Sequence, residues 1–292
     1  MALDYVRDED IRILRAHLRH RQSHAMRPLF VFPCGGNERE FSSRRSLREF
    51  VSKTSDPALR NVFCLVAEDV AVSGALGGAN LLQQEAMLAD ICDWIVVFAE
   101  SAGSLCELGA FAVLPHAAAV TTLAIDRGYL GERSFLADGP AREIREGGQP
   151  LNEVFYLDLQ DPLGDRYFSS FVRDLRENVR RGLRRSLLAS RKSFNRDEDD
   201  VRVGPLVHEL LDLLQFAGPM PVCDLFDLYC DVKGFRRRYA RRAYSTTLLE
   251  DMRLREGARV PFEAVVGMML ATGLVSRDVA PARPTAAAPT PA

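Results

Sequence analysis

The sequence predicts an α/β protein: a flavodoxin-like or Rossmann-like parallel sheet of about five strands, followed by a smaller helical domain of winged-helix type. Two observations predict this class. In the first half of the chain, continuous apolar runs alternate with stretches of helical spacing, which is typical of a parallel sheet covered on both faces. From residue 203 onward, helical spacing occurs three times within a short stretch, as in helix-turn-helix domains.

The expected elements alternate along the chain. Residues 9–22 carry apolar positions among arginines and predict a surface helix that leads into the core. RPLFVFPCGG at 27–36 predicts the first strand, stopped by a proline and a glycine pair, and SSRRSLREFVSK at 42–53 predicts a helix. Further strands are expected at 61–67, 93–99, 120–126 and 153–159, and further helices at 80–92 and from about 104.

The same pattern divides the chain into four segments. Residues 1–162 are expected to form the sheet domain, and 163–200 a long basic helix that ends in a charged linker. Residues 201–278 are expected to form the winged-helix-like domain. The tail at 279–292 is rich in Pro and Ala and is expected to be disordered, because it has too few large apolar residues to form a core.

Composition and charge exclude several classes of protein. The 292 residues include 38 Lys and Arg against 40 Asp and Glu, so the chain as a whole has no basic excess for binding nucleic acid. The six cysteines form no Cys-x-x-Cys pair, which favours a reducing compartment. No apolar run is long enough for a signal peptide or a membrane span, so we expect a cytoplasmic protein without membrane contact.

A carboxylate follows the third expected strand, in ESAGSLCELGAF at 100–111. Parallel sheets bind ligands in the crevice beyond the carboxyl ends of their strands. Gly103 permits a tight turn there, and Ser104 is expected to cap a helix whose first turn holds Glu107. The alternative is that Ser104 and Glu107 form an ordinary capping box without catalytic meaning.

Other polar residues are expected at the same edge of the sheet. Glu68 and Asp69 end the second strand and are candidate acceptors for ribose hydroxyls, and Glu85 lies on the helix before the third strand. Each has the alternative of an ordinary solvated carboxylate. The remaining candidate substrate-binding residues lie in two loops. Gly35, Gly36 and Asn37 form a turn that allows the backbone to approach a phosphate or a base closely. Ser101, Gly103 and Ser104 lie in the loop at the start of the helix.

The stretch ESAGSLCELGAF resembles the signature of nucleoside 2-deoxyribosyltransferases, in which a Glu followed by Leu-Gly comes after a Gly-Ser or Gly-Thr turn. A closer resemblance is to the effector proteins of bacterial retron defence systems. It is carried also by FPCGGN, by NLLQQEAMLADICDWIVV and by RSFLADGP at 133–140. This chain departs from many relatives in having Ala102 where they carry Pro. The resemblance implies that Glu107 is the nucleophile.

The resemblance also implies an activity and partners. The expected activity is a toxic N-glycosidase that cleaves NAD or a related nucleotide and needs no cofactor, with hydrolase and transferase both left open. The expected partners are a reverse transcriptase and its multicopy single-stranded DNA, which restrain the effector in a higher-order oligomer. The alternatives are a nucleotide-sensing regulator without turnover and, less favoured because of the appended basic module, a housekeeping nucleoside transferase.

Two clusters of basic residues and one cluster of histidines are candidate binding sites. KGFRRRYARR at 233–242 suits phosphate tracking and base stacking, or else a solvated helix face. A second basic patch on the expected long helix predicts an interface with RNA, DNA or protein. It comprises Arg180, Arg181, Arg184 and Arg185. His17, His20 and His24 share a helix face, but histidines among arginines are more often solvated, and no metal site is expected. The candidate nucleic-acid-binding residues are Lys233, Arg236, Arg237, Arg238, Arg241 and Arg242.

Overall fold

The computed structural model describes residues 8–19, 29–53, 62–68, 81–146, 153–162, 171, 201–234, 252–253 and 262–276. These ranges include all five expected strands. Within them, no helix is long and apolar enough to cross a membrane.

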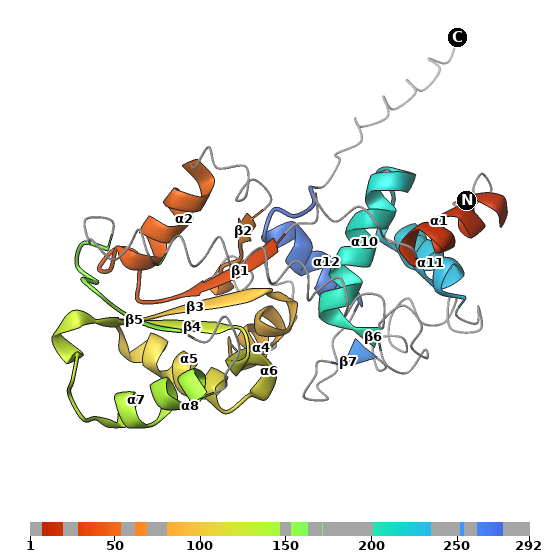
Figure 1. Ribbon diagram of the computed structural model, residues 1–292. Helices are drawn as coiled ribbons and strands as arrows, with labels where there is room; N and C mark the ends of the chain where they lie inside the picture. Colours follow the sequence, from red (N-terminus) through yellow and green to blue (C-terminus); the bar gives the residue numbers. More distant parts are fainter. Residues whose placement is uncertain are drawn as a thin grey trace, which may run out of the picture.

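A five-stranded parallel sheet forms the centre of the first half of the chain (Figure 1). The strands are β1 (Leu29–Cys34), β2 (Val62–Cys64), β3 (Trp94–Ala99), β4 (Thr121–Asp126) and β5 (Val154–Leu157). Their order, β2-β1-β3-β4-β5, is the flavodoxin-like order. The predicted fold class is therefore confirmed, and each strand lies inside the range expected for it.

Helices cover both faces of this sheet because successive side chains of each strand point to opposite faces. On one face, Val31, Val96 and Phe98 form a core with Leu47 and Val51 of α2 (Ser43–Lys53). On the other face, strand residues pack against α4 (Leu81–Ile91), α5 (Ala102–Ala112), α6 (Pro115–Ala118) and α8 (Pro140–Glu146). Figure 1 shows α2 on one side of the sheet and α5 to α8 on the other.

Two short elements complete the first half. The 3-10 helix η2 (Arg127–Tyr129) follows β4, and α7 (Phe135–Asp138) precedes α8. Trp94 is buried in the sheet core, where its Nε1 donates to Thr122 Oγ1 at 2.7 Å. This confirms that Trp94 is a core residue, as the sequence predicts.

The C-terminal half forms a helical unit of α10 (Val203–Ala217), α11 (Val222–Lys233) and α12 (Phe262–Ala271). The described residues of this region form three helices, the number expected. The two short strands β6 (Val201–Arg202) and β7 (Met252–Arg253) pair in parallel and precede α10 and α12. The expected extended segment after the third helix lies outside the described residues.

The N-terminal helix α1 (Asp8–Arg19) packs against α10 and α11, so it belongs to this helical unit in space (Figure 1). Arg15 fixes the contact: its Nη2 donates to the carbonyl of Asp231 at 2.7 Å and its Nε to that of Val232 at 2.9 Å. These carbonyls lie in the last turn of α11, where the carbonyl of Asp231 also accepts from the N–H of the C-cap residue Gly234 at 3.2 Å. The first helix therefore caps the end of a helix that is distant in sequence.

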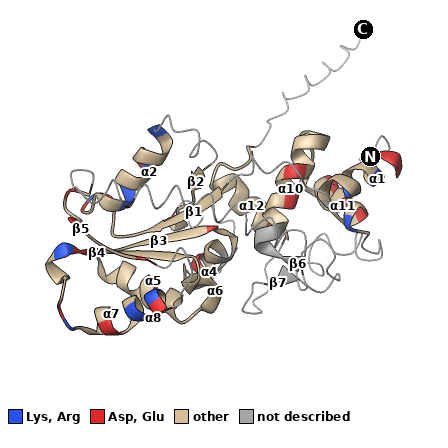
Figure 2. Ribbon diagram, in the orientation of Figure 1, with Lys and Arg blue, Asp and Glu red and all other residues tan. Residues whose placement is uncertain are grey.

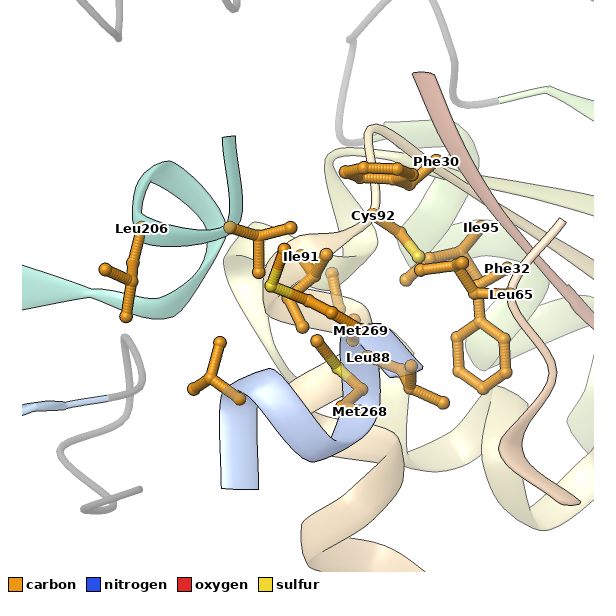
Figure 3. Packing of buried hydrophobic residues seen from close by; sticks show 14 of the residues in the cluster. Phe30, Phe32, Leu65, Leu88, Ile91, Cys92, Ile95, Leu206, Met268 and Met269 are labelled. Carbon is orange, nitrogen blue, oxygen red and sulfur yellow. The ribbon is translucent and has the colours of Figure 1, made fainter. Parts of the chain in front are cut away.

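The helical unit and the sheet share one hydrophobic core. The ring of His208 on α10 stacks on Phe30 of β1, with ring centroids 4.9 Å apart. Figure 3 shows Met268 and Met269 of α12 beside Leu88 and Ile91 of α4. The C-terminal helices are therefore packed directly on one covering layer of the sheet. The long basic helix expected at 163–196 lies outside the described residues except for Phe171, which is buried against Trp94 and Phe155.

Candidate functional site

The strand order places the topological switch point of the sheet between β1 and β3. The chain leaves β1 toward β2 on one side and β3 toward β4 on the other, and ligands of open α/β sheets bind at such a switch point. The loop after β1 begins with Gly35 and Gly36, and the turn after β3 begins with Glu100 and Ser101. Two segments predicted from the sequence as site loops therefore meet at this edge of the sheet.

Glu107 lies in the second turn of α5 and is half-buried. The helix begins three residues earlier than expected: its N-cap is Ser101, whose Oγ accepts from the backbone N–H of Ser104 at 3.1 Å. The prediction that Ser104 caps the helix is wrong. Ser104 is fully buried, and its Oγ accepts from the backbone N–H of Ser101 at 3.0 Å in a reciprocal capping box.

The capping box of α5 gives Ser101 and Ser104 a structural role. The hydroxyls of Ser101 and Ser104 are occupied in holding the turn between β3 and α5, so they position the helix that carries Glu107. The expected tight turn at Gly103 is also wrong, because Gly103 lies in the first turn of α5. A Cβ at Gly103 would have only Ser101 Oγ within 4 Å, at 3.8 Å, so neither the backbone nor the packing requires glycine there.

The two glycines after β1 are required by close packing. The N–H of Gly36 donates to Glu100 Oε1 at 3.0 Å. A Cβ at Gly35 would lie 2.8 Å from that same oxygen, and a Cβ at Gly36 would lie 2.2 Å from the ring of Phe41. The turn thus brings the backbone against the carboxylate of Glu100. Asn37 is exposed and its Oδ1 accepts from the N–H of Arg39 at 3.0 Å, which shapes the rest of the loop.

A cluster of carboxyl groups surrounds Glu107. The pKa of Glu107 is raised to about 7, first by burial and then by the negative charge of Glu85 on α4. Its carboxyl group also interacts with the Cys34 thiol, and Glu68 adds further negative charge. Burial likewise raises the pKa of Glu85, and the interaction with Glu107 opposes that rise. Among the described residues, Glu107 Oε2 is buried and has no hydrogen-bond partner.

Glu100 supplies a second available carboxylate oxygen. Burial raises its pKa, while the nearby Ser43 side chain, the hydrogen bond from the Gly36 N–H and the charge of Arg44 oppose the rise. Its Oε2 is buried and has no partner within the described part of the chain. Because a buried acceptor without a partner is costly, Glu100 and Glu107 both offer an oxygen suited to a polar ligand.

Among the described residues, Arg44 is the cation whose charge acts on Glu107 and Glu100. It lies in the first turn of α2, and its side chain is 9% exposed. Its Nη1 lies 2.7 Å from Glu68 Oε1, so Glu68 is ion-paired, although 58% of its side chain is exposed. Asp69, the other candidate from that strand end, lies outside the described residues.

Sequence reasoning missed Arg44, Glu100 and Cys34. Glu100 ends a buried strand at the crevice, and Arg44 begins the helix after β1, so their positions carried a signal. A strand end or a helix start, however, does not show which side chain turns inward.

The described residues contain no cluster of His, Cys, Asp and Glu arranged to hold a metal ion. The arrangement suits a carboxylate nucleophile or base that works beside a second carboxyl group.

A hollow of about 810 Å³ lies on the other face of α5, away from this cluster. Gly109 and Val113 of α5 line it, together with residues of α6, α7 and α8 such as Phe135. None of the residues predicted from the sequence as site residues lines this hollow. We therefore place the functional site at the carboxyl cluster, where the buried unpaired oxygens lie.

The predicted nucleic-acid residues are only partly described. Lys233 ends α11 and is buried: its Nζ lies 3.2 Å from Glu209 Oε1, and the two side chains are 6% and 7% exposed. Its charge is thus neutralised inside the helical unit, and contact with a phosphate would require breaking this pair. Outside the described residues lie Arg236, Arg237, Arg238, Arg241, Arg242, Arg180, Arg181, Arg184 and Arg185.

The described C-terminal helices carry more acidic than basic residues. Figure 2 shows acidic residues on α10 and both signs of charge on α11. These acidic residues include Glu209, Asp212 and Asp224. His17, one of the three histidines weighed as metal ligands, packs edge-on against Phe216, with ring centroids 4.4 Å apart. His20 and His24 lie outside the described residues.

Comparisons with known proteins identify the family to which most of the chain is similar. The sequence model of the family described as STM3845 retron effector protein matches residues 41–256. The retron Ec73 putative ribosyltransferase/DNA-binding protein of Escherichia coli is 24% identical over 228 residues, which cover 73% of this chain and 69% of that protein. The retron Ec86 putative ribosyltransferase/DNA-binding protein of Escherichia coli is 34% identical over 119 residues, covering 40% of this chain and 37% of that protein.

Proposed function

The chain belongs to the STM3845 retron effector protein family, and from this premise we propose that it is an N-glycosidase that cleaves NAD or a related nucleotide with Glu107 as its nucleophile. One observation carries the proposal. Glu107 presents a buried oxygen without a hydrogen-bond partner among the described residues, at the switch point of the sheet. The names of the two relatives, which include the term ribosyltransferase, support the same class of reaction.

The reaction centre is the anomeric carbon of the ribosyl group. When the bond to the base breaks, that carbon develops positive charge, and the Glu107 carboxylate stabilises it or forms a bond to it. The electron pair of the broken bond goes to the base. Water then forms the new bond to the carbon; where Glu107 had bonded to that carbon, this bond breaks and its electron pair returns to the carboxylate. We assign to Glu85 the role of taking the proton that the water loses.

The charge of the site favours a base that is cationic in the substrate. Four glutamates, Glu68, Glu85, Glu100 and Glu107, gather near one arginine. The nicotinamide ring of NAD is a cation and leaves as a neutral molecule, so it needs no proton from the protein. A cation beside Glu107 also lowers the pKa of that carboxyl group and increases the ionised fraction that can act as nucleophile.

Other residues of the site have proposed roles in holding the ribose. The free Oε2 of Glu100 is the best acceptor for a ribose hydroxyl, since the carboxylate is fixed by the Gly36 N–H. Glu68 is less suited than the sequence predicts, because Arg44 already occupies one of its oxygens. Asn37 is exposed at the rim and remains a candidate contact for the rest of the nucleotide, as does Asp69.

We propose further that a retron reverse transcriptase and its multicopy single-stranded DNA restrain this activity. Family membership supports association with retron components, and both relatives carry DNA-binding in their names. The basic residues Arg236, Arg237, Arg238, Arg241 and Arg242 are the proposed DNA contacts. Lys233 is left out of that set because it is paired with Glu209.

The test is product analysis with the purified full-length chain. NAD is incubated with it, alone and with an excess of a second pyridine base, and the products are separated by chromatography. Equal amounts of nicotinamide and ADP-ribose support the hydrolase, and an exchanged dinucleotide supports a transferase. Faster cleavage of neutral deoxynucleosides than of NAD would contradict the proposed substrate class.

A binding measurement separates the alternative function. If calorimetry shows that NAD binds and chromatography shows no cleavage, with and without the retron partners, the protein is a nucleotide sensor and the N-glycosidase proposal is wrong. The sensor alternative is kept because the same free oxygens of Glu100 and Glu107 suit ligand binding without turnover.

A further inference from the structure

Arg44 joins two strand ends beside the proposed nucleophile. Its Nη1 lies 2.7 Å from Oε1 of Glu68, which follows β2, and its Nε lies 3.4 Å from Oε1 of Glu38, in the loop after β1. The start of α2 is held in place by Ser43, whose Oγ donates to the carbonyl of Leu159 at 3.2 Å. The guanidinium is therefore buried and held by the ion pair to Glu68, while its Nε has no hydrogen-bond partner among the described residues.

We propose that Arg44 is the positioning residue of Glu107: its buried guanidinium binds Glu38 and Glu68 and directs a fixed positive charge at the carboxyl cluster. The inference rests on the proposed function of Glu107 and goes beyond it by assigning a role to a residue outside the predicted site. An arginine suits this role because its guanidinium stays charged when buried and its planar fork binds two carboxylates at once.

The groups that face Glu107 come from four elements. Glu85 lies on α4, Glu68 follows β2, and the Cys34 thiol ends β1. Among the described residues, the charges of Glu85 and Glu68 raise the pKa of Glu107, the hydrogen bond of the Cys34 thiol lowers it, and Arg44 of α2 is the cation that acts on Glu107. Glu107 has to be ionised to act as nucleophile, yet burial and the neighbouring carboxylates favour its protonated form. The charge of Arg44 opposes both effects.

The chain offers a matched control one helical turn away. Arg48 lies on the same helix, and its Nη1 lies 2.8 Å from the same Glu38 Oε1. Its side chain is 38% exposed, against 9% for Arg44, so solvent screens the charge of Arg48 more strongly. Arg44→Gln and Arg48→Gln therefore remove the same charge and the same kind of pair to Glu38, but only the first removes the cation beside Glu107.

The experiment is the dependence of kcat/KM for NAD on pH, between pH 5 and 9, for wild type, R44Q, R44K and R48Q. In R44Q the rising limb is expected to move up by about one pH unit, so that kcat/KM falls about tenfold at pH 6 and approaches wild type at high pH. R44K keeps the charge and is expected to keep the wild-type midpoint. An unchanged midpoint in R44Q, or an equal shift in R48Q, would overturn the proposal.

A second variant covers the case in which R44Q does not fold. Glu68→Gln removes a negative charge near Glu107 and leaves Arg44 less neutralised, so the midpoint should move to lower pH. A midpoint that stays or rises would contradict the role of Arg44.

Thermal unfolding keeps the inference testable if the wild type cleaves nothing. The pKa of Glu107 is raised above its ordinary value of 4.5, so the stability it contributes is full below pH 4.5 and is lost as pH rises through about 7. At pH 8 the E107Q change should raise Tm more in the R44Q background than in the R48Q background. Equal increases in Tm in the two backgrounds would contradict the inference. Absence of turnover alone would contradict only the proposed function.

Discussion

The carboxyl group of Glu85 on α4 acts on that of Glu107 on α5 at the carboxyl edge of the sheet: after burial, its negative charge is the largest cause of the raised pKa of Glu107. The pKa of both groups is raised, mainly by burial, and that of Glu107 reaches about 7. The pair therefore holds a proton in the pH range where cells operate, and its titration belongs to the pair as a whole.

The first prediction concerns pH. A nucleophilic Glu107 must be ionised in the free enzyme, so kcat/KM for NAD should rise as pH increases through about 7. The measurement is the initial rate at low substrate concentration in a series of buffers of equal ionic strength. A rate that falls over this range would assign Glu107 the role of an acid.

Glu85→Gln changes the same profile in a defined direction. The change removes the neighbouring negative charge that raises the pKa of Glu107, so the rising limb should move to lower pH. If Glu85 also accepts the proton of the attacking water, the plateau at high pH should fall as well. A profile identical to wild type would show that the pair is not coupled during turnover.

The glycines of the site give a matched pair of stability predictions. Gly36→Ala places a Cβ 2.2 Å from the Phe41 ring, and relieving this contact is expected to cost about 1–3 kcal/mol. Gly103→Ala meets no atom closer than 3.8 Å and removes a helical glycine, so it should stabilise the protein by about 0.5–1 kcal/mol. Urea denaturation of both variants checks the signs, and a destabilised G103A would contradict the described cap.

The buried pair of Glu209 and Lys233 gives a further stability prediction. Glu209→Gln removes the carboxylate that pairs with the buried ammonium of Lys233, and breaking such a pair costs about 3–5 kcal/mol. The double variant E209Q/K233M removes both charges and should be more stable than E209Q alone. Denaturation curves for the two variants provide the test, and equal losses would show that Lys233 reaches solvent.

Much of the fold could be predicted from the sequence because its signals are local. The continuous apolar runs at β1, β3 and β4 identify buried parallel strands, and they place Glu107 just beyond one of them. The start of α5 was predicted wrongly because its first residues contain two serines three apart, and both can cap a helix. Only the hydrogen bonds distinguish Ser101 as the cap from Ser104.

The rest of the site depends on contacts between distant segments. Nothing in the sequence near Arg44 indicates that it pairs with Glu68, and nothing near Glu85 indicates that it meets Glu107. The shared core of the C-terminal helices and the sheet is of the same kind, since His208 and Phe30 stack across 178 positions of the chain. Spacing rules describe one element at a time and leave such pairings undetermined.

The most direct test of the central claim compares E107Q with C106S, the exposed neighbour on the same helix, in a nicotinamide-release assay with NAD. Circular dichroism and a thermal melt establish that both variants are folded. We predict that C106S releases nicotinamide at the wild-type rate and that E107Q releases none above the rate of the uncatalysed reaction. A folded E107Q that still releases nicotinamide at the wild-type rate would contradict the account.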